Sequence, residues 1–90
     1  MLDSLNLFEA KATMRAIIDD IVREGIVSDK ESVTSFALYN FQFIVNGQSM
    51  SDSLRTKFAS KYIRSVGFGF YYGPVNVMGR GIFMNKSDLY

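Results

Sequence analysis

The 90-residue sequence contains no cysteine, no histidine, no tryptophan and a single proline. Without cysteine there is no disulfide, thiolate nucleophile, cysteine-rich zinc site or iron–sulfur cluster. Without histidine the commonest general base and the commonest metal ligand are missing as well. We therefore expect a protein that is not an enzyme and that holds no cofactor and no metal.

Long apolar runs are also missing. The longest mostly apolar stretch, residues 36–45, is interrupted by Asn40 and Gln42 and is shorter than the roughly 18 residues of a membrane helix. The first residues include Asp3 and lack a positive region followed by an apolar one, which argues against a secretory signal. We expect no membrane partner and a cytoplasmic location, which for a viral protein means the host cytoplasm or the virion.

What is present suits one small folded domain spanning residues 1–90. Hydrophobic residues make up 48% of the chain, aromatic residues 14%, and the net charge is only +1. Such a composition argues against intrinsic disorder, although a chain this short buries only roughly 60–65% of its unfolded surface. Contacts with a partner would add stability that the small core lacks.

The first expected element is a helix over residues 7–24. Asn6 and Glu9 are spaced as a capping box, and Gly25 stands where a left-handed helix cap is needed. Apolar residues recur at intervals of three and four and form one stripe: Phe8, Met14, Ile17, Ile18, Ile21 and Val22.

A second helix is expected over residues 29–46. Ser28 and Glu31 have capping-box spacing, and Val33, Phe36, Ala37, Asn40 and Ile44 share one helical face. Residues 39–45 also alternate with period two, which suits a strand ending in the turn 46–47. Residues 48–53 are too polar for a returning strand, and this decides for a helix.

A third helix is expected over residues 52–66, and a β element over residues 68–84. Five of the seven glycines and the proline lie between positions 67 and 81, where helical patterning stops. Strands at 68–72, 75–78 and 82–84, separated by glycine-containing turns, read as a β-hairpin with a further strand. The expected fold is mainly α with a small C-terminal β element, an α+β class of three helices followed by a glycine-rich hairpin.

Three enzyme-like motifs are weak. The glycines at 67, 69 and 73 miss the dinucleotide-binding spacing and follow a helix instead of preceding one. Asp19 and Asp20 are adjacent on a helix and point about 100° apart, so a shared metal is disfavoured. The serines of the run Ser51-Asp52-Ser53 lack a histidine to activate them, and helix capping explains the run.

The charge distribution is more informative than the net charge. Residues 1–53 carry four basic and eight acidic side chains, a net charge of −4, whereas residues 54–90 carry six basic and one acidic, a net charge of +5. Four of the basic residues, Arg55, Lys57, Lys61 and Arg64, lie on the expected third helix away from its apolar face. They could bind a phosphate backbone or an acidic protein surface, or simply form a solvated face balanced by the acidic first helix.

Three helices before a hairpin is also the order of parts in a winged-helix domain. In that case the third helix would enter the major groove of DNA and Arg80 would lie on the wing. The nearly neutral charge and the long second helix argue against it, so nucleic acid is the alternative partner.

Four aromatic residues follow the third helix. They could stack single-stranded bases, but such rings more often fill a core or a protein interface. A small domain cannot easily bury both faces of a short hairpin, so we expect some rings to remain exposed, including those of Phe41, Phe43, Phe83 and Tyr90.

The leading hypothesis is a non-catalytic protein-interaction module, a regulator, an inhibitor or a subunit of a larger, for example viral, assembly. It would bind a protein or a second copy of itself through Arg55, Lys57, Lys61, Arg64, Phe68, Phe70, Tyr71, Tyr72 and Arg80.

Overall fold

The computed structural model describes residues 7–64, 67–77 and 79–89. Its first helix, α1 (Leu7–Arg23), confirms the helix expected over residues 7–24. The helix ends in a Schellman motif, in which the N–H of Gly25 bonds to Val22 and the N–H of Ile26 bonds to Ile21. Gly25 adopts the left-handed φ of 78° that this cap requires. The proposed cap at Asn6 lies outside the described residues. The buried stripe of α1 contains Ala10, Met14, Ile17, Ile18 and Ile21.

The prediction of a helix over residues 29–46 is wrong. Asp29 caps a single 3-10 turn, η1 (Lys30–Ser32), and the chain then forms the strands β1 (Phe36–Tyr39) and β2 (Gln42–Val45). These strands pair in an antiparallel hairpin. The period-two alternation over residues 39–45 predicts only part of this hairpin. Phe43 and Val45 are buried in the core, but Phe41 is exposed in the turn, and the core positions of β1 are Phe36 and Leu38.

The returning strand does exist, but it is short and polar. β3 (Gln48–Ser49) pairs with β2, and both of its residues are exposed at the edge of the sheet. The turn between β2 and β3 has φ values of 53° at Asn46 and 81° at Gly47, as in the Asn-Gly type I′ turn that favours hairpins. Polarity argued against this strand only because we assumed that a strand must bury one face.

The third predicted helix is present but shorter than expected. The helix α2 (Asp52–Tyr62) begins at the Ser51 cap, whose hydroxyl accepts a hydrogen bond from the N–H of Leu54, so the capping interpretation of the serine run is confirmed. The helix ends before Ile63 instead of extending to residue 66, and residues 65–66 lie outside the described part.

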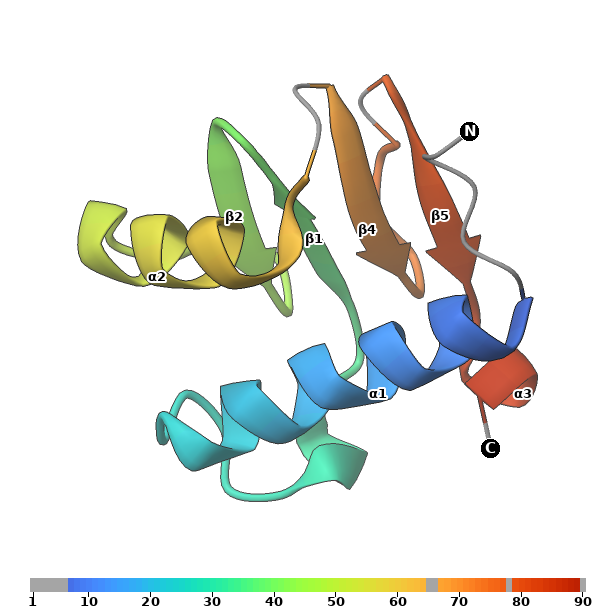
Figure 1. Ribbon diagram of the computed structural model, residues 1–90. Helices are drawn as coiled ribbons and strands as arrows, with labels where there is room; N and C mark the ends of the chain where they lie inside the picture. Colours follow the sequence, from blue (N-terminus) through green and yellow to red (C-terminus); the bar gives the residue numbers. More distant parts are fainter. Residues whose placement is uncertain (1–6, 65–66, 78, 90) are drawn as a thin grey trace.

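The prediction of a C-terminal hairpin is also wrong. β4 (Phe68–Tyr72) and β5 (Arg80–Met84) pair in parallel, and β1 joins β4 antiparallel. The result is one mixed five-stranded sheet of order β3-β2-β1-β4-β5. In Figure 1 the connection between β4 and β5 returns along the side of the sheet away from α1, and a short helix α3 (Lys86–Leu89) follows β5.

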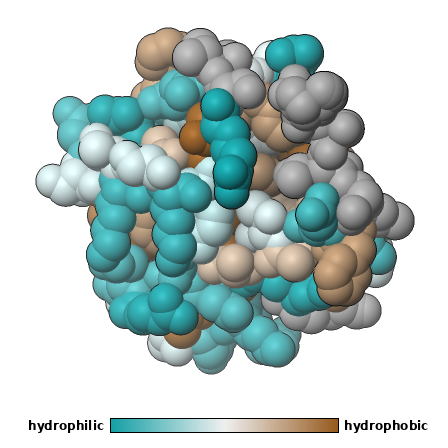
Figure 2. Space-filling model, viewed as in Figure 1, coloured by the Kyte–Doolittle hydropathy of each residue, from teal (hydrophilic) through white to brown (hydrophobic). Residues whose placement is uncertain are grey.

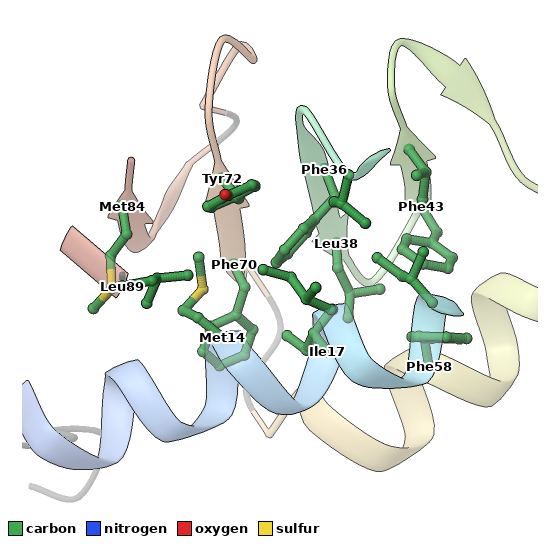
Figure 3. Packing of buried hydrophobic residues seen from close by; sticks show 14 of the residues in the cluster. Met14, Ile17, Phe36, Leu38, Phe43, Phe58, Phe70, Tyr72, Met84 and Leu89 are labelled. Atoms are coloured by element: carbon green, nitrogen blue, oxygen red, sulfur yellow. The ribbon is translucent and has the colours of Figure 1, made fainter. Parts of the chain in front are cut away.

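Both long helices cover one face of this sheet (Figure 1). In Figure 3 the core side chains of β1, β2, β4 and β5 point toward those of α1 and α2. The rings of Phe43 and Phe58 lie 4.4 Å apart and join α2 to the sheet, while Phe36 and Tyr72 stack at 5.6 Å. The molecule is therefore a helix layer on a mixed sheet, not a mainly α fold with a hairpin. The element order of a winged-helix domain is absent from the described residues.

No helix in the described ranges has the length and apolar character needed to cross a lipid bilayer.

Candidate functional site

Two basic residues of α2, Lys57 and Lys61, face the acidic end of α1. Lys57 forms an ion pair with Glu24, and the Nζ of Lys61 lies 2.7 Å from Oδ2 of Asp20. Figure 2 shows mostly hydrophilic residues on this side of the molecule, with hydrophobic residues in separate areas. Two of the four expected partner-binding cations of this helix thus join α2 to α1, as the balanced-face alternative anticipated.

Asp20 is the centre of this contact. Only 8% of the residue is exposed, and its carboxylate also accepts hydrogen bonds from Arg23, at 2.6 Å, and from the hydroxyl of Tyr62. Burial alone would raise the pKa of Asp20, but the hydrogen bonds from Lys61 and Tyr62 and the nearby positive charges outweigh it and lower the pKa. Burial and the bond to Asp20 raise the pKa of Tyr62 above its usual range.

The contact encloses a cleft of about 150 Å³ that is lined by the same charged side chains. The charged side chains that line the cleft are paired with one another, and these pairs join α1 and the residue that follows it to α2. Asp19 is exposed while Asp20 is buried, so the two carboxylates do not converge. Within the described ranges, no group of three acidic side chains is arranged to hold a metal ion.

The aromatic run of β4 is a core element, which corrects the expectation that it forms an exposed surface. Phe70 and Tyr72 point to the helix-covered face, and Tyr71 is fully buried on the outer face of the sheet, the face away from α1 and α2. Phe68 is half-buried and meets Phe70 edge to face. Of the other rings expected to be exposed, Phe43 is buried and Tyr90 lies outside the described residues. Large apolar side chains that are exposed in the described part are Phe8, Phe41, Val77 and Phe83.

Phe41 lies in the two-residue turn between β1 and β2, at the end of the sheet where β4 and β5 begin. Its neighbour Asn40 forms hydrogen bonds that join this turn to other segments at the same end of the sheet. The side-chain oxygen of Asn40 accepts from the N–H of Gly67 at 3.0 Å, and its backbone carbonyl accepts from the guanidinium of Arg55 at 2.8 Å. The carbonyl of Gly67 in turn accepts from the N–H of Arg80 at 3.1 Å. Four separate segments are therefore joined by hydrogen bonds at one end of the sheet.

This end concentrates positive charge beside an exposed ring. Phe41 is 72% exposed, and Arg80 is exposed as well. Arg55 has a carboxylate nearby, that of exposed Asp52 at 3.7 Å, whereas the other described acidic residues belong to α1, to the segment that follows it as far as η1, and to α3. We call this group the turn-end surface and define it as Phe41, Arg55, Phe68 and Arg80.

A second concave region lies on the outer face of the sheet. It is a shallow groove of about 460 Å³ between β1, β2 and the segment that follows β4. Its walls include Tyr39, whose hydroxyl donates to Gln42 at 2.7 Å, and the exposed residues Pro74 and Asn76. The groove has no charged side chain in its lining, so nothing there selects an ionic ligand.

The structure thus brings together three of the nine residues singled out from the sequence, namely Arg55, Phe68 and Arg80. Arg64 is exposed after the end of α2. Lys57 and Lys61 are engaged with α1, and Phe70, Tyr71 and Tyr72 are buried. The sequence did not single out Asn40 as a functional residue, and it marked Phe41 only as an exposed ring and not as the centre of a surface. Their turn contains no glycine or proline and has negative φ at both positions, so it carries no turn signal in the sequence.

Comparison with protein-family models, with curated proteins and with solved structures finds no significant match to this chain. A functional proposal therefore depends on the chemistry of the residues described above.

Proposed function

We propose that the protein is a non-catalytic interaction module that binds an acidic segment of a partner protein at the turn-end surface. The single observation that carries this proposal is the exposed ring of Phe41 at a sheet end that also bears Arg55 and Arg80. Protein-binding hot spots are enriched in arginine and aromatic residues, because both combine large contact area with directional contacts.

The chemistry of the partner follows from these side chains. Guanidinium groups bind carboxylates through paired N–H donors, and an aromatic ring supplies apolar contact next to them. Asn40 anchors the surrounding segments to one another, so little ordering cost remains when a partner binds. A peptide that combines aspartate or glutamate with an apolar residue fits this surface best.

Nucleic acid is less well supported as the partner. The stripe that would follow a phosphate backbone requires Lys57 and Lys61, and both are engaged by carboxylates, those of Glu24 and Asp20. The aromatic rings that would stack bases are mostly buried.

A random peptide library displayed on phage tests the proposal. We expect selection on the immobilised protein to enrich acidic peptides that contain an apolar residue. Affinity for a selected peptide should fall about tenfold for Arg80→Ser and for Phe41→Ser, because each change removes a hot-spot contact. Isothermal titration calorimetry would measure these affinities.

Phe8→Ser is the matched control, because Phe8 is 76% exposed but lies on the first turn of α1. It should leave the affinity unchanged. The proposal is wrong if the enriched peptides lack acidic residues, if Phe8→Ser weakens binding as much as Phe41→Ser, or if oligothymidylate binds more tightly than any selected peptide.

A further inference from the structure

The two edges of the sheet differ in a way that bears on self-association. β3 closes one edge with two exposed polar residues, a short strand of the kind that resists edge pairing. β5 forms the other edge with five residues, and its single charged residue, Arg80, is at its start. Phe83, near the middle of this edge, is 48% exposed. Among the described residues no strand pairs with the outer side of β5.

Alternate residues of β5 direct their backbone hydrogen-bonding groups away from β4, and no described strand pairs with these groups. The N–H of Arg80 bonds to Gly67, and the carbonyl of Met84 bonds to Gly73, so these two residues direct their groups toward β4 and the segments flanking it. Donors and acceptors alternate between the two sides of a strand. The N–H and carbonyl groups of Gly81 and Phe83 therefore point to the open edge.

We propose that a second copy of this chain pairs with the β5 edge in an antiparallel arrangement centred on Ile82. In that register Gly81 of each copy lies opposite Phe83 of the other. The outward groups of these residues are then mutually satisfied by about four backbone hydrogen bonds around a two-fold axis. The two sheets become one continuous ten-stranded sheet, in which β3 forms both outer edges.

Side chains fit the same register. Phe83 points to the outer face of the sheet, where the ring of one copy lies beside Gly81 of the other, an exposed residue with no side chain to oppose the ring. Arg80 lies opposite Met84 of the other copy, so like charges are not brought face to face. A second copy is therefore the occupant for which both the backbone and the side chains are complementary.

Analytical ultracentrifugation over a concentration series tests the proposal with the full chain. We expect a reversible dimer whose dissociation constant rises at least tenfold in Phe83→Lys, because a lysine on an edge strand opposes pairing. Phe83→Pro is a second variant. It removes an N–H that faces the open edge and leaves the bonds from β5 to β4 intact. Phe41→Lys is the control, because its turn is separated from β5 by β4, and it should dimerise like the unchanged protein.

Amide hydrogen exchange measured by NMR identifies the surface directly. In dilute protein the amides of Gly81 and Phe83 should exchange rapidly and that of Ile82 slowly, and concentrating the protein should slow the exchange of the first two. A chain that stays monomeric at millimolar concentration overturns the proposal. So does a dimer that tolerates Phe83→Lys or leaves both amides in rapid exchange.

Discussion

Asp20 shows how one side chain connects segments that are distant in the sequence. Its carboxylate accepts from Arg23 in α1 and from Lys61 and Tyr62 in α2, across a separation of 41 and 42 residues for the last two. A buried carboxylate with this many donors is held in its charged form. Removing it would leave the charge of Lys61 and the Tyr62 hydroxyl without their partner.

The first prediction concerns the acid stability that Asp20 provides. Because its pKa is lower in the folded protein than the ordinary value of 3.8, the unfolded chain takes up the proton first as the pH falls. The stabilisation is fully present above this ordinary value and is lost as the pH falls below it, through the folded pKa. Asp20→Asn should therefore lower the free energy of unfolding at pH 7 by about 1–3 kcal/mol, and the difference should shrink at more acidic pH.

Urea denaturation between pH 7 and pH 2.5 measures this difference. Asp19→Asn is the control, since the exposed neighbouring carboxylate should contribute less than about 0.5 kcal/mol at any pH. An Asp20→Asn deficit that is equally large at both ends of the pH range would contradict the ion-pair explanation.

The segment after β4 depends on a glycine. Gly73 has φ of 73°, and a Cβ placed there would lie 2.4 Å from the carbonyl oxygen of Thr34. Gly47, in the β2–β3 turn, has a similar φ of 81° but open space around it. Alanine substitutions at these two glycines can therefore be compared. At Gly47 the substitution destabilises the protein only through its left-handed backbone, whereas at Gly73 a steric clash adds to that destabilisation.

We predict that Gly47→Ala destabilises the protein by about 1–2 kcal/mol, the usual cost of a left-handed alanine. Gly73→Ala should cost about 3 kcal/mol or more, because the added methyl group also displaces the strand entry at Thr34. Thermal and urea unfolding of both variants measure the two costs. Equal destabilisation by the two substitutions would mean that the close approach of Gly73 to Thr34 does not constrain the fold.

Some elements were predictable from local patterns and others were not. The stripe and the Gly25 cap of α1 and the Ser51 cap of α2 are short-range signals, and α1 ends and α2 begins where these signals stand. The alternation over residues 39–45 was correct for β2 but included Phe41, which lies in the turn, and the exposed partner β3 could not be recognised because an edge strand need not be apolar. The parallel pairing of β4 with β5 was not predictable, since its connection is shorter than the dozen or more residues usual for parallel crossovers.

At the scale of the whole molecule, the opposite charges of the two halves of the sequence serve two purposes. Part of the positive charge is neutralised by acidic residues of the first half: Lys57 pairs with Glu24, Lys61 with Asp20 and Lys86 with Glu31. Arg55 and Arg80 are left at one end of the sheet. The sequence identified these cations through their distribution, but only the fold separates those that hold the helices together from those that remain available.

The mapping of a bound acidic peptide by amide chemical shifts tests the central claim most directly. Titration of the labelled protein with a peptide selected from the library should shift the amides of residues 40–41, 67–68 and 80, and about tenfold more peptide should be needed for the same shifts in Arg80→Ser. Shifts that instead concentrate in the outer groove around Tyr39 and Val75, or in the cleft between α1 and α2, would contradict the assignment of the turn-end surface as the binding site.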